Sequence, residues 1–314
     1  MGNRNQKIKN QKSTENWRTG EIEEYSNLYV IHPISAELTR RLARWNWSPN
    51  TVSGLGLLSA LLASYSFYHY RSLGMSMLGL AFMLGWHIFD GADGQLARLT
   101  GKTSEFGKVI DGLCDHLGFG MVYIALAMAT QPLYGPGIWI VATTAALSHL
   151  VQAGALEFHR DNYDCWVHRK AGKCVPSPDR LRKMSSVPHD LLQSGHILYV
   201  RMQLLFAEAD ADLLARGEKL RDQPDRETLG QIYQRIALNS VRRWGWLSAN
   251  KRTFAVAIFC MVNLPILFFL FEIVVLNGLL LWLQIKQRQT NRVLLRAILR
   301  TRGLPPGEKP WGVM

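Results

Sequence analysis

The sequence predicts an all-α integral membrane protein with six transmembrane helices, an N-terminal amphipathic interfacial helix and a long cytoplasmic helical insertion between spans 4 and 5. Three observations predict this fold class. Apolar runs of about 20 residues, the length that crosses a bilayer, recur along the chain. An amphipathic segment precedes the first run, and the Lys and Arg residues concentrate in alternate connections. The mean hydropathy of −0.02 conceals the apolar runs because basic segments offset them in the average.

The N-terminal part divides into two segments. Residues 1–24 are polar and lack the apolar stretch of a signal peptide, so we expect a flexible tail. Residues 25–47 are expected to form an amphipathic juxtamembrane helix, because apolar residues recur there at steps of three and four. These apolar residues are Ile31, Ile34, Leu38, Leu42 and Trp45, and the basic ones are Arg40, Arg41 and Arg44. Such a helix suits a membrane surface better than the core of a soluble domain, since a hydrophobic span follows directly.

Apolar runs also place the spans. Ser48 as N-cap and Pro49 as first helical residue predict the start of span 1. The first four spans are expected at residues 52–68, 73–90, 109–129 and 138–158. The apolar block 254–283 is too long for one untilted span and short for two. Either Pro265 or the Asn277 and Gly278 pair breaks this block, and the sequence leaves that choice open.

The distribution of basic residues favours six spans over five. In a six-span arrangement 35 of the 36 Lys and Arg residues lie on one side of the membrane, with Arg71 as the exception. The positive-inside rule makes that side cytoplasmic, and both termini lie on it. A five-span chain would export the seven basic residues that follow the apolar block 254–283. We therefore expect a multi-pass protein of the bacterial inner membrane, with residues 48–290 as the six-span domain and 291–314 as a basic cytoplasmic tail.

The net charge of +12 points to anionic partners. Nucleic acid is one such partner, but lipid headgroups of the bilayer and a phosphorylated substrate explain the charge as well, and the membrane spans favour them. We therefore expect no nucleic acid among the partners.

The insertion, residues 160–250, carries no motif that we can interpret. Helices are expected at about 197–216 and 229–246, with a polar loop near 222–225. Cys165, His168 and Cys174 faintly resemble a zinc site, with His159 and His189 nearby. Their spacing matches no standard zinc module, so ordinary interfacial residues are favoured. A cytoplasmic location argues against disulfides.

Between spans 2 and 3 lies the stretch DGADGQLARLTGKTSEFGKVIDGLCD, residues 90–115, which holds four aspartates. At 100° per residue, one set of residues falls within about 100° of one helix face and a second set within about 80° of another. The first set is Asp90, Asp93, Gly94 and Ala97, and the second is Gly107, Asp111 and Asp115. Two helices can therefore direct four carboxylates at one point.

Four converging carboxylates repel one another unless something cationic lies between them. Oxygen-only ligands favour Mg²⁺, Mn²⁺ or Ca²⁺ over zinc, which normally takes His or Cys. Two ions shared by four carboxylates form the arrangement that stabilises attacking and leaving oxygens in phosphoryl transfer. An ion or proton pathway, or acids neutralised by arginines, would account for the charges differently.

The spacing D-x2-D-G-x2-A-R-x8-G-x3-D-x3-D is complete in this stretch and resembles the signature of the CDP-alcohol phosphotransferase (phosphatidyltransferase) family. The resemblance covers about residues 45–160. It implies two Mg²⁺ or Mn²⁺ ions bound by the four aspartates, with Asp115 also acting as the general base. It places Gly94, Ala97 and Gly107 against the cytidine and lets Arg98 pair with the diphosphate or orient an aspartate. For Arg98 a buried structural salt bridge is the alternative. Pro49 and Asn50 resemble a Pro-Asn pair that opens the first span in this family.

The implied reaction is attack of an acceptor hydroxyl, deprotonated by Asp115, on the β-phosphorus of a CDP-alcohol, with release of CMP. We favour transfer of a phosphatidyl group from CDP-diacylglycerol to a small polar alcohol, because the chain is compact. The alternative is transfer of a headgroup from CDP-choline or CDP-ethanolamine to diacylglycerol or ceramide. A cation pathway is a remote alternative. The family resemblance also implies a homodimer.

Overall fold

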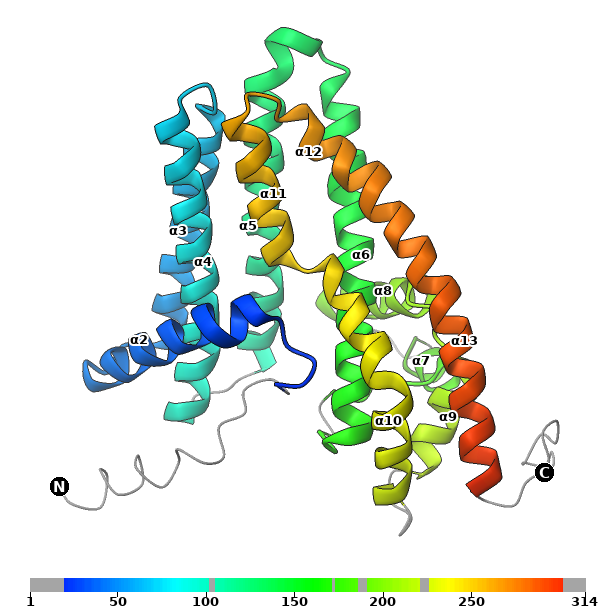
Figure 1. Cartoon of the computed structure of the whole chain (residues 1–314). Coiled ribbons are helices and arrows are strands. Elements are labelled where there is room, and N and C mark those ends of the chain that lie inside the picture. The colour runs from blue at the N-terminus through cyan, green and yellow to red at the C-terminus, as the bar shows by residue number, and fades with distance from the viewer. Residues whose placement is uncertain (1–19, 102–104, 171–172, 186–190, 221–225, 302–314) are drawn as a thin grey trace.

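The computed structural model describes residues 20–101, 105–170, 173–185, 191–220 and 226–301. Within these ranges the chain is helical and contains no strand, which confirms the all-α class. Figure 1 shows α3, α4 and α5 standing together, with α11 beside them, and α6, α10 and α13 forming a second group. A buried apolar cluster contributed by α3, α4, α5, α6, α11 and α12 joins the two groups.

In chain order, the described helices are η2 (Asn27–Ile31), α2 (His32–Arg44), α3 (Pro49–Tyr68), α4 (Leu73–Thr100), α5 (Glu105–Tyr134), α6 (Ile138–Val167), α7 (Pro178–Ser185), α8 (Leu191–Phe206), α9 (Ala211–Leu220), α10 (Arg226–Trp244), η4 (Gly245–Leu247), α11 (Ala249–Met261), α12 (Ile266–Leu270), η5 (Phe271–Leu276) and α13 (Asn277–Thr301). The helix α3 begins as the sequence predicts, because the Ser48 hydroxyl accepts a hydrogen bond from the Thr51 amide and Pro49 occupies the first turn.

Five of the described helical stretches are long and apolar enough to cross a membrane. They are Pro49–Tyr68, Leu73–Thr100, Leu117–Tyr134, Ile138–Val167 and Ile266–Thr301. The first four agree with the spans predicted from the sequence. The remaining predicted span corresponds to α11, which has 13 residues and packs against α4. Figure 1 shows that the α11–α12 turn lies at the same end as the α3–α4 and α5–α6 turns. The count of six therefore stays a prediction.

The break in the last apolar block lies at Pro265. Asn263 adopts a left-handed conformation with φ 59°, and Pro265 is the N-cap of α12. Asn277, the other candidate, lies inside a continuous helical run and donates a hydrogen bond to the Ser148 hydroxyl. Asparagine tolerates the left-handed region and proline cannot continue a helix from the preceding turn, which explains the position of the break.

A buried ion pair fixes α11 against the last long helix. Arg252 of α11 donates a hydrogen bond to Glu272 of η5 at 3.1 Å, and both side chains are at most 1% exposed. Arg252 also donates to the Gln152 side chain of α6 at 2.6 Å. Because charges buried in this way are costly unless paired and hydrogen-bonded, the three helices meet here in one defined arrangement.

The helix α2 lies crosswise to α3 and α4 (Figure 1). Among the apolar residues of the predicted membrane-surface helix, Ile34 and Trp45 are 46% and 67% exposed, whereas Leu42 and the neighbouring Ile31 of η2 are buried in the protein. Two hydroxyl residues, Ser35 and Thr39, are also buried, against α4.

The insertion contains more helices than the sequence predicts. The expected single helix at 197–216 is wrong, because α8 ends at Phe206, Glu208 has φ 54°, and α9 starts at Ala211. The second expected helix is confirmed as α10, which packs against α6 and α13. The predicted loop near 222–225 lies outside the described residues, as does His189.

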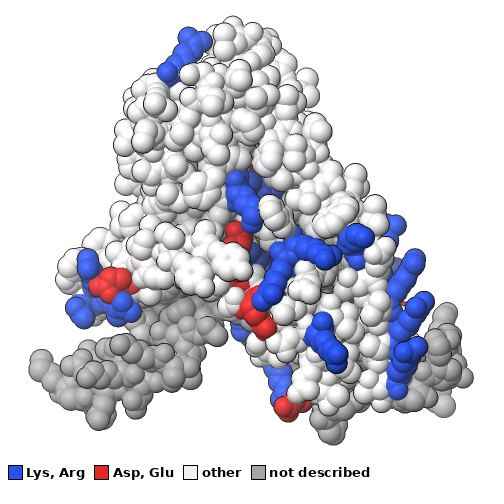
Figure 2. All heavy atoms as spheres, in the orientation of Figure 1, with Lys and Arg blue, Asp and Glu red and all other residues white. Residues whose placement is uncertain are grey.

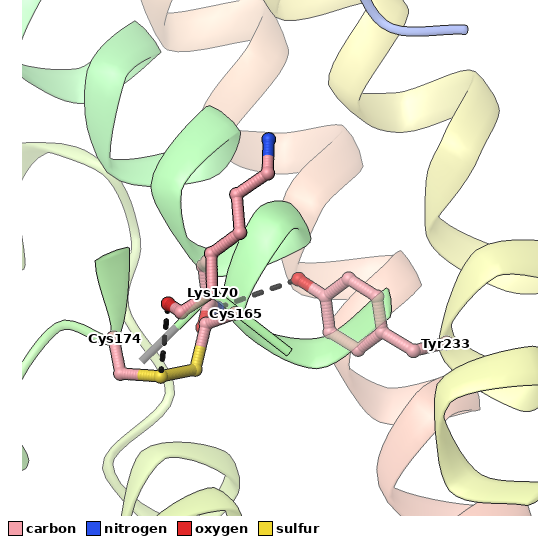
Figure 3. The surroundings of a disulfide bond; sticks show 5 residues. Cys165, Lys170, Cys174 and Tyr233 are labelled. Carbon is pink, nitrogen blue, oxygen red and sulfur yellow. Dashed lines mark hydrogen bonds between the residues drawn. A yellow bond between two sulfur atoms is a disulfide. The ribbon is translucent and has the colours of Figure 1, made fainter. Parts of the chain in front are cut away.

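The prediction that the chain has no disulfide, which followed from the expected cytoplasmic location, is also wrong. Cys165, in the last turn of α6, forms a disulfide with Cys174 across a Cα–Cα distance of 4.9 Å (Figure 3). The Cys174 sulfur also lies 3.8 Å from the Lys170 carbonyl oxygen. His168, which the zinc hypothesis grouped with these sulfurs, contacts Glu21 at 3.1 Å. The part of the chain that is described contains no group of three or more metal-ligating side chains.

Candidate active site

The first half of the aspartate motif lies in the last turns of α4. This helix is unbroken from Leu73 to Thr100, so Asp90, Asp93, Gly94 and Ala97 keep the helical spacing that the sequence predicts. The helix ends at Gly101, whose φ of 70° requires the left-handed region that glycine adopts readily. The next described helix, α5, begins at Glu105.

Asp93 is the more buried of the two described motif aspartates. Its side chain is 3% exposed, whereas Asp90 is half-buried. One carboxylate oxygen of Asp93 accepts a hydrogen bond from the Ser53 hydroxyl of α3 at 2.5 Å. The beginning of α3 therefore lies directly beside the motif. Sequence reasoning missed Ser53, for which the only signal is its position one turn after Pro49.

The space that a side chain at Gly94 would occupy lies next to the Arg98 guanidinium. A Cβ atom at Gly94 would lie 3.5 Å from the guanidinium nitrogens of Arg98, an ordinary contact distance. Arg98 is exposed. Ala97 is half-buried on the same face. An exposed guanidinium beside a side-chain-free surface is suited to bind an anionic group.

The second half of the motif, Gly107, Asp111 and Asp115, lies in α5, and the side chains of these three residues are outside the described part. The backbone register of α5 is set farther along by Gly118. A Cβ there would lie 2.7 Å from the Trp86 ring of α4, so only glycine permits this approach. Because α4 and α5 are antiparallel (Figure 1) and each residue adds 1.5 Å, residues 90 and 93 are level with about residues 114 and 111.

The motif helix is held from two further sides. Ser35 of α2 donates to the Ile88 carbonyl at 2.9 Å, and Thr39 donates to the Ala92 carbonyl at 3.2 Å. At Gly91, between the two aspartates, a Cβ atom would lie 2.8 Å from the Ser35 oxygen. On another face, His87 hydrogen-bonds Thr253 of α11 at 2.8 Å. The backbone that carries Asp90 and Asp93 is therefore fixed by α2, α3 and α11 together.

The two described motif carboxylates are of a chemical type that suits a hard divalent cation. Asp90 and Asp93 carry carboxylate oxygens one turn apart on α4. The stretch 90–115 contains no His, and Cys114 is its only Cys. Carboxylate donors of this kind fit Mg²⁺ or Mn²⁺. The set is complete only with the two aspartates of α5.

A cavity of about 500 Å³ lies at the opposite end of α4 and does not belong to this site. It is bordered by Tyr68, Arg71, Met75 and Pro132 among others. Met75 and Asp93 are separated by about 27 Å along the helix at 1.5 Å per residue. The cavity therefore lies far from the motif.

Comparison with known proteins agrees with the motif. The model of the CDP-alcohol phosphatidyltransferase family matches residues 46–174. The archaetidylinositol phosphate synthase of Pyrococcus horikoshii is 35% identical over 99 residues, which are 32% of this chain and 50% of that protein. The phosphatidylinositol phosphate synthase of Mycolicibacterium smegmatis is 26% identical over 211 residues, 63% of this chain and 91% of that protein.

The phosphatidylinositol phosphate synthase of Mycobacteroides abscessus is 26% identical over 148 residues, 47% of this chain and 64% of that protein. The chain thus spans half to two thirds of the length of two of these three relatives. The segment matched by the family model extends over α3 to α6 and contains the motif. The chain therefore carries a domain of the CDP-alcohol phosphatidyltransferase family over residues 46–174.

Proposed function

We propose that this protein transfers a phosphatidyl group from CDP-diacylglycerol to the hydroxyl of a small polar alcohol and releases CMP. The observation that carries the proposal is the complete eight-residue motif at the adjoining ends of α4 and α5, inside the family domain. The family uses CDP-activated donors and alcohol acceptors, and the relatives named phosphatidylinositol phosphate synthase favour the lipid as the CDP ester. Their names also make a phosphorylated inositol the first acceptor to test.

The motif aspartates serve both metal binding and proton transfer. Asp90, Asp93, Asp111 and Asp115 would hold Mg²⁺ or Mn²⁺, which neutralises the diphosphate and the departing CMP when bound. Asp115 takes the proton from the acceptor hydroxyl. Ser53 orients Asp93 through its hydrogen bond.

The exposed Arg98 pairs with the diphosphate oxygens, and the missing side chains at Gly94 and Gly107 let the cytidine approach the helices. Ala97, which carries only a methyl group, borders the same surface.

The membrane arrangement follows from charge. We propose six spans, with α11 as the fifth, and a cytoplasmic motif. Figure 2 shows Lys and Arg gathered over the half of the molecule that contains α2, α10 and the end of α13, while the opposite end is almost free of charge. By the positive-inside rule the basic half faces the cytoplasm, where a water-soluble acceptor reaches the motif. A homodimer remains a prediction from the family resemblance.

The test compares donors. Purified protein in detergent with Mg²⁺ receives CDP-diacylglycerol with inositol phosphate, inositol, serine and glycerol 3-phosphate, or CDP-choline with diacylglycerol. We expect CMP release only from the first mixture, and omission of alcohols one by one identifies the acceptor. Release only from the second mixture would reverse the donor assignment. Release from neither, with Mg²⁺ or Mn²⁺, would contradict the proposed function.

A further inference from the structure

Residues 21–27 form a segment, termed the N-terminal strap, that connects α2 to the second group of helices. Figure 1 shows it leading from the crosswise α2 toward the junction of α10 and α11. Its side chains and backbone bind residues more than 130 positions away in the sequence.

Glu24 is the charged anchor of the strap. One carboxylate oxygen accepts a hydrogen bond from Arg160 of α6 at 2.9 Å. The other accepts from the Ser248 hydroxyl at 2.7 Å and lies 3.4 Å from the Lys251 ammonium of α11. The Glu24 and Arg160 side chains are only 11% and 12% exposed. Burial of this extent makes loss of either partner costly, so the bridge fixes the strap in one position.

Two neighbouring groups reinforce the anchor. Ile22 is 6% exposed and packs in an apolar cluster with Trp166 and Tyr233. The Glu21 carboxylate accepts a hydrogen bond from Gln234 at 2.8 Å and contacts His168 at 3.1 Å. Burial alone would raise the pKa of Glu21, but these hydrogen bonds outweigh it and the pKa is lowered. The carboxylate therefore stays charged and docked at neutral pH.

The other end of the strap leads without interruption to the motif. Asn250 of α11 donates to the Ser26 hydroxyl at 2.8 Å and to the Asn27 side chain at 2.6 Å. From Asn27 the helical run η2 and α2 continues to Arg44. This run carries Ser35 and Thr39, whose hydroxyls bind the backbone beside Asp90 and Asp93. A displacement of the strap is thus transmitted through α2 to the motif helix.

We propose that Glu24 is a positioning residue for the transfer reaction: its bridge to Arg160 and Lys251 sets the place of α2 and, through α2, the place of the Asp90 and Asp93 carboxylates. This inference rests on the proposed function. Because small misplacements of reacting groups lower turnover strongly, Glu24→Gln should reduce kcat for CMP release by about tenfold while KM for the donor changes little.

Glu37→Gln is the matched control. Glu37 lies on α2 and, like Glu24, pairs with two basic side chains, but its partners Arg40 and Arg41 belong to the same helix and are exposed. Removal of this carboxylate cuts no link to the second group of helices. The control should therefore leave kcat unchanged.

A rescue separates positioning from a general loss of stability. Ser26→Cys with Asn250→Cys replaces a 2.8 Å hydrogen bond by a disulfide that holds the strap to α11. In the Glu24→Gln background, formation of this cross-link, verified by mass spectrometry of the joined peptides, should restore most of the lost kcat. The unmutated protein, treated with the same oxidant, controls for effects on the native cysteines.

An unchanged kcat in Glu24→Gln would overturn the proposal, and so would a formed cross-link that restores nothing. Mn²⁺ affinity, measured by electron paramagnetic resonance in the same variants, provides a readout without turnover. Weaker Mn²⁺ binding in Glu24→Gln that recovers on cross-linking supports the proposal even where the chosen substrates release no CMP. Unchanged Mn²⁺ binding together with unchanged turnover refutes the positioning role of Glu24. Failure of the unmutated protein to release CMP counts against the proposed function alone.

Discussion

At the scale of single residues, the site depends on hydroxyl groups that hold the motif in place. Ser53 binds the Asp93 carboxylate, and Ser35 and Thr39 bind backbone carbonyls within the motif segment. A buried carboxylate that loses one of its donors is both less well oriented and less well compensated. These hydroxyls therefore support the candidate site from outside the motif.

Ser53→Ala tests this role. Hydrogen bonds to charged groups contribute about 1.5–3 kcal/mol, so we expect kcat for CMP release to fall by at least about tenfold. Ser53→Thr, which keeps the hydroxyl, should retain most of the activity. Full activity in the alanine variant would show that Asp93 needs no orientation from α3.

The motif residues were predictable because their chemistry and spacing are distinctive, whereas the supporting hydroxyls were not. Asp90, Asp93, Gly94, Ala97 and Arg98 keep in the structure the helical spacing on which the sequence argument relied. Serine and threonine that bind carbonyls follow no periodic pattern, so Ser35 and Thr39 were indistinguishable from the polar side of an amphipathic helix. Their burial depends on the crossing of α2 over α4, which a one-dimensional pattern does not contain.

At the scale of helices, the relative placement of α4 and α5 decides whether the two halves of the motif meet. Trp86 and Gly118 set that placement, because the indole lies directly over the glycine. Phe119 adds an edge-on contact with the same indole. Close packing of this kind tolerates no added volume.

Gly118→Ala should therefore destabilise the protein by about 1–3 kcal/mol and reduce CMP release, because the new methyl group would push α5 away from Trp86. Thermal unfolding in detergent measures the first effect. Gly120→Ala is the matched control two residues farther along α5, since nothing lies within 4 Å of its Cβ position. Equal stability of the two variants would mean that this contact does not set the register.

Hydropathy predicted the helix positions wherever a span is long and apolar. The prediction failed where the hydropathy pattern was ambiguous. The first four spans and α10 were predicted close to their observed bounds. The split between α8 and α9 was missed because the break at Glu208 uses neither glycine nor proline. The choice between Pro265 and Asn277 as the break in the last apolar block depended on the backbone conformation, which the sequence pattern does not contain.

At the scale of the whole molecule, two features suggest opposite compartments for the same half. The concentration of Lys and Arg predicts a cytoplasmic face (Figure 2), whereas the Cys165–Cys174 disulfide is typical of oxidising surroundings. A cytoplasmic location, inferred from the charge pattern, was the only ground for expecting no disulfide. That expectation was overturned by the local path of the chain after α6, which brings two cysteines nine positions apart together.

The disulfide predicts a thiol count. Protein purified without reductant and unfolded in denaturant should gain two titratable thiols on reduction, and Cys174→Ser should abolish the gain while lowering stability by about 2–4 kcal/mol. Cys260→Ser, which removes a free buried cysteine, should leave the gain at two. A count that does not change on reduction would show that the two cysteines are thiols in the protein as isolated.

The proposed function requires that the aspartates of α4 and α5 form one metal-dependent site for CMP-releasing transfer. The most direct measurement is CMP release from CDP-diacylglycerol and the identified alcohol, with Mg²⁺ or with EDTA, for the unmutated protein and for Asp115→Asn. We predict release that requires Mg²⁺ and a loss of at least about 100-fold in the variant, since general-base catalysis contributes roughly 10²–10⁴-fold. CMP release that persists in EDTA, or that survives intact in Asp115→Asn, would contradict the account.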